Sequence, residues 1–224
     1  RGGAGSDTLD GGSGVDIANY ETSKAVQKNL KNNYATGGEA SNDKFVNIEG
    51  IKASNNDDAI IGDDNANIIY ANDGDDVVSA NGGDDVVFGG NGNDYIKGDA
   101  GNDTLYGEDG DDILIGGAGD DILVGGTGKN MLYGDSGKDT VLYKGKSEDY
   151  EILFINENTL FVKSKDGKTL DTLRNIEELA FDDADIINDS KFAILIASLI
   201  EGTIGYIALS MTLKKKKKKK YDDD

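Results

Sequence analysis

The chain has 224 residues, with 43 Asp or Glu against 23 Lys or Arg, a formal net charge of −20, and neither histidine nor cysteine. The lack of histidine excludes Ser-His-Asp, Cys-His and zinc-protease sites, and the acidity argues against nucleic acid, which binds to basic patches. We therefore expect no catalytic residue and no organic cofactor in this chain.

Residues 1–19 hold two copies of a glycine-rich nonapeptide. Their first eight residues are Gly2-Gly3-Ala4-Gly5-Ser6-Asp7-Thr8-Leu9 and Gly11-Gly12-Ser13-Gly14-Val15-Asp16-Ile17-Ala18. Residues 20–52 interrupt the repeat and end in Asn47-Ile48-Glu49-Gly50-Ile51, so we expect an insert of loop and strand there. The chain opens in mid-repeat without Met or a signal peptide, and we expect it to be a piece of a longer protein.

Residues 53–142 repeat ten times with a period of nine. The sixth position is always acidic or an amide and the eighth is always aliphatic. The sixth-position residues are Asp58, Asn67, Asp76, Asp85, Asp94, Asp103, Asp112, Asp121, Asn130 and Asp139. The eighth-position residues are Ile60, Ile69, Val78, Val87, Ile96, Leu105, Leu114, Leu123, Leu132 and Val141.

Each nonapeptide predicts a six-residue turn followed by three extended residues. Glycines at the first, second and fourth positions permit backbone angles that are closed to other residues. In the extended part only the eighth residue faces inward, because side chains alternate along a strand. Two nonapeptides thus form one coil, and stacked coils form two parallel sheets. We predict an all-β fold, a right-handed parallel β-roll (β-helix), in which turns of this type bind calcium.

The charge of the array supports a metal between the coils. Residues 53–142 carry −17 of the chain's net charge of −20. Stacking would hold these charges about one strand spacing apart, ~5 Å, and they should repel each other without cations. Carboxylate and carbonyl oxygens around a flexible cavity suit Ca²⁺ better than Mg²⁺. We expect Ca²⁺ binding and folding to be one equilibrium.

The rest of the chain differs in composition. Residues 143–190 alternate apolar and polar positions and contain an Asp166-Gly167 turn, which predicts a small β segment that caps the open end of the roll. Residues 191–224 form an apolar and poly-lysine tail, in which 192–213 has a single charge, Glu201. Three interpretations of this tail remain open: an export signal, a membrane-spanning helix, or a buried or non-native segment.

The array, the preceding pair of repeats and the segment 171–183 resemble the repeats-in-toxin (RTX) hemolysin-type family. The resemblance implies a C-terminal region of a protein that a Gram-negative bacterium exports through its type I secretion apparatus, and that folds outside the cell or at its surface. It also implies roughly eight Ca²⁺ ions in the main array. The implied side-chain ligands are Asp58, Asn67, Asp76, Asp85, Asp94, Asp103, Asp112, Asp121, Asn130 and Asp139, with Asp7 and Asp16 in the first pair.

Some copies depart from the family pattern. Asn67 and Asn130 keep an oxygen but lose the charge. Alanine or asparagine replaces turn glycines at 71–72 and 80–81, where we expect left-handed backbone to be costlier. We predict the best sites at Asp85, Asp94, Asp103, Asp112 and Asp121.

The even-numbered repeats place apolar residues at their outward seventh and ninth positions. Tyr70, Phe88 and Tyr106 belong to this face, which is larger than solvated surfaces usually tolerate. We expect residues 143–187 to cover it, or otherwise a protein or glycan partner or another copy.

Three functions fit these features. The first is a calcium-triggered folding and secretion module of a larger adhesin or surface-layer-like protein. The second is the same module on an exported enzyme (protease, lipase or epimerase) whose catalytic domain lies upstream. The third is a binding module that uses the apolar face. The sequence upstream of Arg1 would separate the first two, and binding by the isolated calcium-loaded chain would favour the third.

Overall fold

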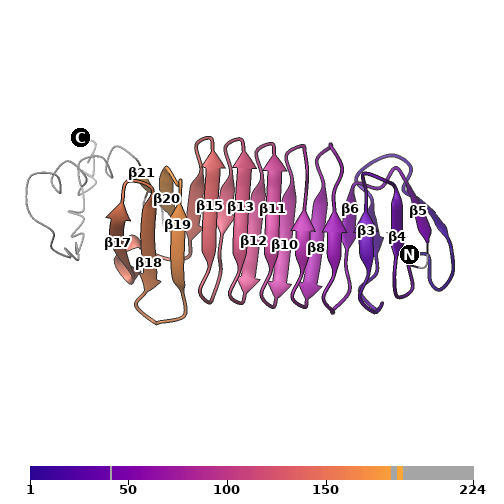
Figure 1. The fold of residues 1–224 in the computed structure, drawn as a ribbon, viewed down its shortest axis with the longest axis horizontal. Helices are drawn as coiled ribbons and strands as arrows, with labels where there is room; N and C mark the ends of the chain where they lie inside the picture. Colours follow the sequence, from indigo (N-terminus) through magenta and orange to yellow (C-terminus); the bar gives the residue numbers. More distant parts are fainter. Residues whose placement is uncertain (41, 183–185, 189–224) are drawn as a thin grey trace, which may run out of the picture.

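A computed structural model describes residues 1–40, 42–182 and 186–188. In it the chain is a long stack of β-coils, and the strands of successive coils form two sheets (Figure 1). The two glycine-rich repeats of residues 1–19 lie at one end of the stack and the strands beyond Tyr143 lie at the other. The predicted parallel β-roll is confirmed. The tail 191–224 lies outside the described residues. Within the part described, no helix is long and apolar enough to cross a membrane.

The larger sheet has twelve strands and follows the odd-numbered repeats of the array. Its neighbouring strands in order are β1 (Thr8–Asp10), β5 (Asp43–Val46), β4 (Tyr34–Thr36), β3 (Gln27–Asn29), β7 (Ala59–Ile61), β9 (Val77–Ser79), β11 (Tyr95–Ala100), β13 (Ile113–Ala118), β15 (Met131–Ser136), β19 (Leu170–Arg174), β18 (Thr159–Ser164) and β17 (Tyr150–Asn156). A short 3₁₀ helix, Ser147–Asp149, precedes β17.

The smaller sheet has nine strands and follows the even-numbered repeats. Its order is β2 (Ile17–Asn19), β6 (Gly50–Lys52), β8 (Ile68–Asp73), β10 (Val86–Asn91), β12 (Thr104–Asp109), β14 (Ile122–Val124), β16 (Thr140–Tyr143), β20 (Glu178–Phe181) and β21 (Ile186–Asn188). In both sheets, strands of the array pair in parallel with the strand that lies 18 residues along the chain. Two nonapeptides therefore make one coil, as the sequence predicts.

Within the array the core consists of eighth-position side chains, which form one ladder in each sheet. Val78 pairs with Ile96 and Ile96 with Leu114, one residue per strand. All ten aliphatic residues at this position are at most 1% exposed. The seventh- and ninth-position neighbours are exposed or half-buried, so the inward-facing prediction is confirmed.

The segment 20–52 is built into the stack rather than looped out of it. β3 and β4 form an antiparallel hairpin between β5 and β7, and β6 joins β2 to β8 in parallel. Lys28 takes the core position on β3, where it pairs with Ile60 and is 1% exposed. Its Nζ lies 4.8 Å from the centroid of the Tyr20 ring, and burial lowers its pKa to about 7.

The strands beyond Tyr143 close the other end of the stack. β19 and β20 continue the two sheets in parallel, and the antiparallel strands β17, β18 and β21 follow at their outer sides. Tyr143, Tyr150 and Phe181 pack their rings together there, with centroids 4.9 to 5.8 Å apart. This is the place where the sequence predicts a cap.

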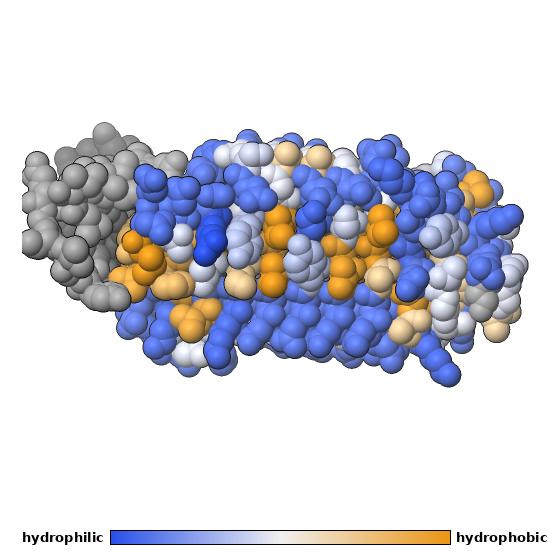
Figure 2. Space-filling model, viewed as in Figure 1, coloured by the Kyte–Doolittle hydropathy of each residue, from blue (hydrophilic) through white to orange (hydrophobic). Residues whose placement is uncertain are grey.

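The apolar face of the smaller sheet is not covered by residues 143–187, so that expectation is wrong for the described residues. The C-terminal strands extend the sheets end to end because their backbone groups pair with the last open strands. Tyr70, Phe88 and Tyr106 stay half-buried, and their rings stack on one another with centroids 4.9 and 4.8 Å apart. Figure 2 shows a face of the roll on which apolar patches lie between bands of hydrophilic residues.

Candidate metal sites in the turn columns

The sixth-position residues stack into two columns along the turns. The first turn column contains Asp58, Asp76, Asp94, Asp112 and Asn130, and the second contains Asn67, Asp85, Asp103, Asp121 and Asp139. Within each column the backbone N–H of one residue donates to the side-chain Oδ1 of the next, 18 residues on. The N···O distances are 2.9 Å from Asp76 to Asp94 and 2.8 Å from Asp85 to Asp103.

The second oxygen of most of these carboxylates has no partner. Asp94 is 2% exposed and Asp112 is 0% exposed, yet the Oδ2 of each accepts no hydrogen bond from the described residues. A buried carboxylate oxygen without a donor is costly, because the group has lost its water. The residues with such an orphaned Oδ2 are Asp7, Asp76, Asp85, Asp94, Asp103, Asp112, Asp121 and Asp139.

Each orphaned oxygen in the middle of the array faces a cradle of backbone. A methyl group added at Gly89 would lie 2.3 Å from Asp94 Oδ2 and 2.8 Å from the carbonyl oxygen of Gly107 in the next coil. At Gly98 the same distances are 2.2 Å to Asp103 Oδ2 and 2.8 Å to the carbonyl oxygen of Gly116. The first glycine of the turn therefore leaves room beside a carboxylate and a carbonyl oxygen.

The glycine at the fourth position of the repeat has a different role, because it lets successive turns stack closely. Gly92 has φ +134°, and a methyl group there would lie 1.9 Å from the carbonyl oxygen of Gly74 in the preceding coil. At the second position a side chain is tolerated, since Asn72 and Asn81 have φ 80° and 75°. Ala71 and Ala80 do not adopt positive φ, so the expected left-handed cost is wrong for the first position. Where the first position holds glycine, it leaves space beside the aspartate Oδ2.

The electrostatics of the columns oppose ionised carboxylates that have no cation beside them. Burial raises the pKa of Asp112 and Asp121 to about 7, and the pKa of Asp85 to about 8. The backbone N–H donors oppose this shift, whereas carboxylates of neighbouring turns add to it. The folded column thus disfavours negative charge that nothing compensates.

Three predicted ligands have their oxygens satisfied by the protein itself. Asp58 Oδ1 accepts from Val26 N at 2.6 Å, and its Oδ2 accepts from the N and Oγ of Ser54 at 2.6 and 2.9 Å. The amide of Asn67 bonds to Asp63, and that of Asn130 bonds to Asp112 and Asp171. These residues stand in the columns but lack the orphaned oxygen.

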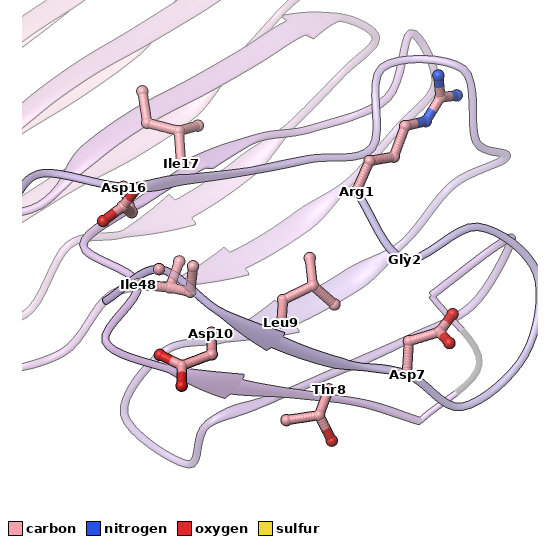
Figure 3. A pocket seen from close by; sticks show the side chains of 10 residues that line it. Arg1, Gly2, Asp7, Thr8, Leu9, Asp10, Asp16, Ile17 and Ile48 are labelled. Carbon is pink, nitrogen blue, oxygen red and sulfur yellow. The ribbon is translucent and has the colours of Figure 1, made fainter. Parts of the chain in front are cut away.

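Asp7 and Asp16 lie at the end of the roll formed by residues 1–19. Figure 3 shows them at opposite sides of a pocket of about 450 Å³, with Leu9 and Ile48 between them, so the two carboxylates do not share a site. Asp7 has an orphaned Oδ2 like the aspartates of the array. Asp16 donates its backbone N–H to Glu49 Oε2 at 2.9 Å.

The donor set fits calcium. Within the described residues no group of three acidic side chains converges as a metal site, so a bound cation would take most of its ligands from turn carbonyls. One carboxylate oxygen and several carbonyl oxygens per turn are hard ligands, which Ca²⁺ accepts in flexible geometry. Bound there, Ca²⁺ would supply the positive charge that the orphaned Oδ2 atoms lack.

Four column members were missed by the sequence analysis. Asp43 and Glu49 follow Asp7 and Asp16, whose backbone N–H groups they accept. Asp171 and Glu177 follow Asn130 and Asp139 in the same way. The signal is a pattern that occurs twice, Asp-x-x-x-Asn-Ile-Glu at 43–49 and at 171–177.

Comparison with known proteins agrees with this geometry. A sequence model of the RTX calcium-binding nonapeptide repeat matches four stretches, residues 1–19, 53–87, 88–123 and 115–143. A separate match, 61% identical over 36 residues, relates 16% of this chain to 9% of a Na(+)/H(+) antiporter NhaA of Flavobacterium psychrophilum. That match covers too little of the antiporter to inform the interpretation of the turn columns as metal sites. Through its four repeat stretches, the chain belongs to the RTX calcium-binding repeat family.

Proposed function

We propose that this chain is a calcium-triggered folding module that supports type I secretion of a larger exported protein, of the adhesin or surface-protein kind. Calcium is scarce inside the cell, so the acidic columns repel and the chain stays extended. Outside, calcium at about 10⁻³ M equals or exceeds the dissociation constants of about 10⁻⁴–10⁻³ M typical of extracellular modules. The array then folds and resists sliding back.

The observation that carries this proposal is the set of buried, orphaned Oδ2 atoms. Eight aspartates share this feature at the same place in their turns. A fold that needs no cation would give such oxygens a protein donor, as Ser54 does for Asp58. The raised pKa values of the column point to the same unmet charge.

Linkage gives the size of the expected effect. A site held at ten times its dissociation constant adds about 1.4 kcal/mol to the free energy of unfolding. Roughly eight such sites would add on the order of 11 kcal/mol, comparable to the whole stability of an ordinary domain. A stabilisation of this size by calcium would decide whether the chain folds at all.

A secretion assay tests the proposal. The chain would be exported by a type I secretion-competent cell, with and without external calcium. We expect the variant that changes Asp94, Asp103, Asp112 and Asp121 to Ala to appear outside more slowly than the unchanged chain in calcium. The same four changes should have little effect when external calcium is chelated. Equal export rates with and without calcium would contradict the role in secretion.

The half-buried aromatic ladder of Tyr70, Phe88 and Tyr106 favours a second role, in binding. The rings of Tyr70, Phe88 and Tyr106 occupy each other's faces at interplanar angles of 3° and 5°. Sugars stack on free ring faces, so this arrangement favours a flat apolar protein surface over a glycan. Changing all three residues to Ala should abolish self-association or partner binding of the calcium-loaded chain. Unchanged stability and unchanged association state would remove this role.

A further inference from the structure

We propose that Glu177 and Glu49 are calcium ligands, each of which completes a site at an end of the second turn column. Each site also contains the aspartate of the preceding coil and the backbone carbonyl of the asparagine two residues before the glutamate. The two sites are Asp139–Asn175–Glu177 and Asp16–Asn47–Glu49. This inference rests on the proposed calcium binding of the column itself.

The C-terminal site continues the column beyond the last nonapeptide. Asp139 N donates to Glu177 Oε2 at 2.8 Å, in the way that Asp121 N donates to Asp139 Oδ1 at 3.0 Å. Glu177 therefore stands where the next repeat would place its aspartate. Asp139 is 0% exposed and its Oδ2 has no partner among the described residues. A buried carboxylate oxygen without a protein donor is suited to ligate a cation.

The asparagine carbonyl replaces the carbonyl of a next turn. A methyl group at Gly134 would lie 2.2 Å from the carbonyl oxygen of Asn175 and 2.3 Å from Asp139 Oδ2. In the array the same place is bordered by the carbonyl oxygen of the first glycine one coil on. Asn175 has φ 51°, a left-handed angle that asparagine adopts more readily than most residues. The chain therefore leaves the stack yet still offers an oxygen to the cradle.

The same backbone hydrogen bond and carbonyl position recur in residues 11–50, where the aspartate, Asp16, is half-buried. Asp16 N donates to Glu49 Oε2 at 2.9 Å, and Asn47 has φ 51°. A methyl group at Gly11 would lie 2.1 Å from the carbonyl oxygen of Asn47. In both places the aspartate carbonyl also accepts two backbone N–H groups, from the glutamate and from the residue after it. One local geometry thus recurs where the glycine-rich repeats give way to other sequence.

The first turn column ends differently, which makes the argument specific. There the carboxylates that correspond to Glu49 and Glu177 are Asp43 and Asp171, and the Oδ2 of each accepts from a hydroxyl donor, Tyr20 at 2.8 Å and Tyr143 at 2.9 Å. A carboxylate that accepts from a tyrosine needs no cation. At the ends of the second column no tyrosine is provided among the described residues, and the glutamate brings a second negative charge. Two carboxylates and a carbonyl are a donor set for Ca²⁺.

The experiment counts calcium ions per chain by native mass spectrometry, with affinities from calorimetric titration of CaCl₂ into the full chain. Glu177→Gln keeps an oxygen to accept Asp139 N but removes the charge. We expect one ion fewer than in the unchanged chain, or about tenfold weaker binding at one site, since even outer-shell changes cost 10- to 100-fold. Glu49→Gln should act likewise, and the double variant should lose two ions.

The matched control is Glu178→Gln, one residue along the chain, where the carboxylate pairs with Lys138 Nζ at 2.7 Å. It should keep the full number of ions. If Glu177→Gln and Glu49→Gln bind calcium like the unchanged chain, the glutamates are hydrogen-bond acceptors only and this inference is overturned. If the unchanged chain binds no calcium, the proposed function fails instead. The two failures are therefore distinguishable.

Discussion

At the scale of the residue, each column aspartate has two separate tasks. Its Oδ1 accepts the backbone N–H of the preceding coil and so holds the stack together. In the array, except at Asp58, its Oδ2 has no partner among the described residues, and where the turn begins with glycine this oxygen faces the cradle beside that glycine. Replacing such an aspartate by alanine removes both interactions at once. The glycine beside it offers a cleaner way to disturb the site.

Gly98→Ala places a methyl group 2.2 Å from Asp103 Oδ2, in the space we assign to calcium. Neither Gly98 nor Gly82 has a positive φ, so the backbone tolerates alanine at both. We expect Gly98→Ala to weaken calcium binding and to lower the midpoint of thermal unfolding in calcium by several degrees, as about 1 kcal/mol does in a domain of this size. Gly82→Ala, whose methyl would meet its nearest atom at 3.6 Å, should change neither. Equal effects of the two variants would contradict the cradle.

The pH dependence of the metal-free chain follows from the same carboxylates. Burial raises the pKa of Asp85 to about 8 and that of Asp76 to about 7, above the unfolded value of about 3.9. Folded chains then bind more protons than unfolded chains in this window, so stability is lost as pH rises through the folded pKa values. In excess chelator, we expect β-structure to increase as pH falls from about 8 to about 5.

Calcium reverses this trend, because protons and calcium compete for the same oxygens. Calcium affinity should therefore fall over the same pH interval. Circular dichroism in chelator and calorimetric titration in calcium measure the two trends. A metal-free chain that loses β-structure on acidification would contradict the assignment of buried, uncompensated carboxylates.

At the scale of the element, the coil is the repeated unit of the stack, and the segments at its two ends terminate the stack. Tyr20 directly follows β2 and Tyr143 ends β16, and each donates its hydroxyl to an aspartate of the other sheet, Asp43 in β5 and Asp171 in β19. Burial raises the pKa of Asp171 to about 7, which the Tyr143 hydroxyl opposes by its hydrogen bond. The cap is therefore held by one buried polar pair as well as by its aromatic cluster.

Tyr143→Phe leaves the buried Asp171 Oδ2 without its donor. We expect a loss of about 1–3 kcal/mol in the free energy of unfolding, measured by denaturant titration in saturating calcium. The control is Tyr133→Phe, where the hydroxyl is exposed and lies 3.7 Å from Met131 Sδ. It should cost almost nothing. If Tyr143→Phe leaves the cap as stable as in the unchanged chain, the aromatic packing alone closes the roll.

The repeat could be predicted from the sequence because one period fixes turn, strand and inward side chain together. The hydrogen bond between Tyr143 and Asp171 could not be predicted, because a hairpin outside the nine-residue repeat separates the two residues in sequence. The core position of Lys28 was missed because nothing in the sequence around this lysine indicates that it takes the place of an aliphatic residue. The prediction that residues 143–187 cover the apolar face was wrong because these strands extend the sheets instead of packing on their faces. Alternating apolar and polar residues are compatible with either arrangement.

At the scale of the whole molecule, the fold is a thin aliphatic ladder between two acidic edges. One inward side chain per nine residues is little apolar area for a chain with a net charge of −20. The hydrophobic ladder and the backbone ladders must therefore be assisted by charge compensation along the columns. This is the central claim, and it places calcium among the structural components of the roll.

Far-UV circular dichroism of the full chain at neutral pH, recorded while calcium is added to a chelated sample, tests this claim most directly. The account predicts an unordered spectrum in chelator, which turns cooperatively into a β-strand spectrum as calcium approaches about 10⁻³ M, with no such change in magnesium. A β-strand spectrum that is already complete in excess chelator would contradict it.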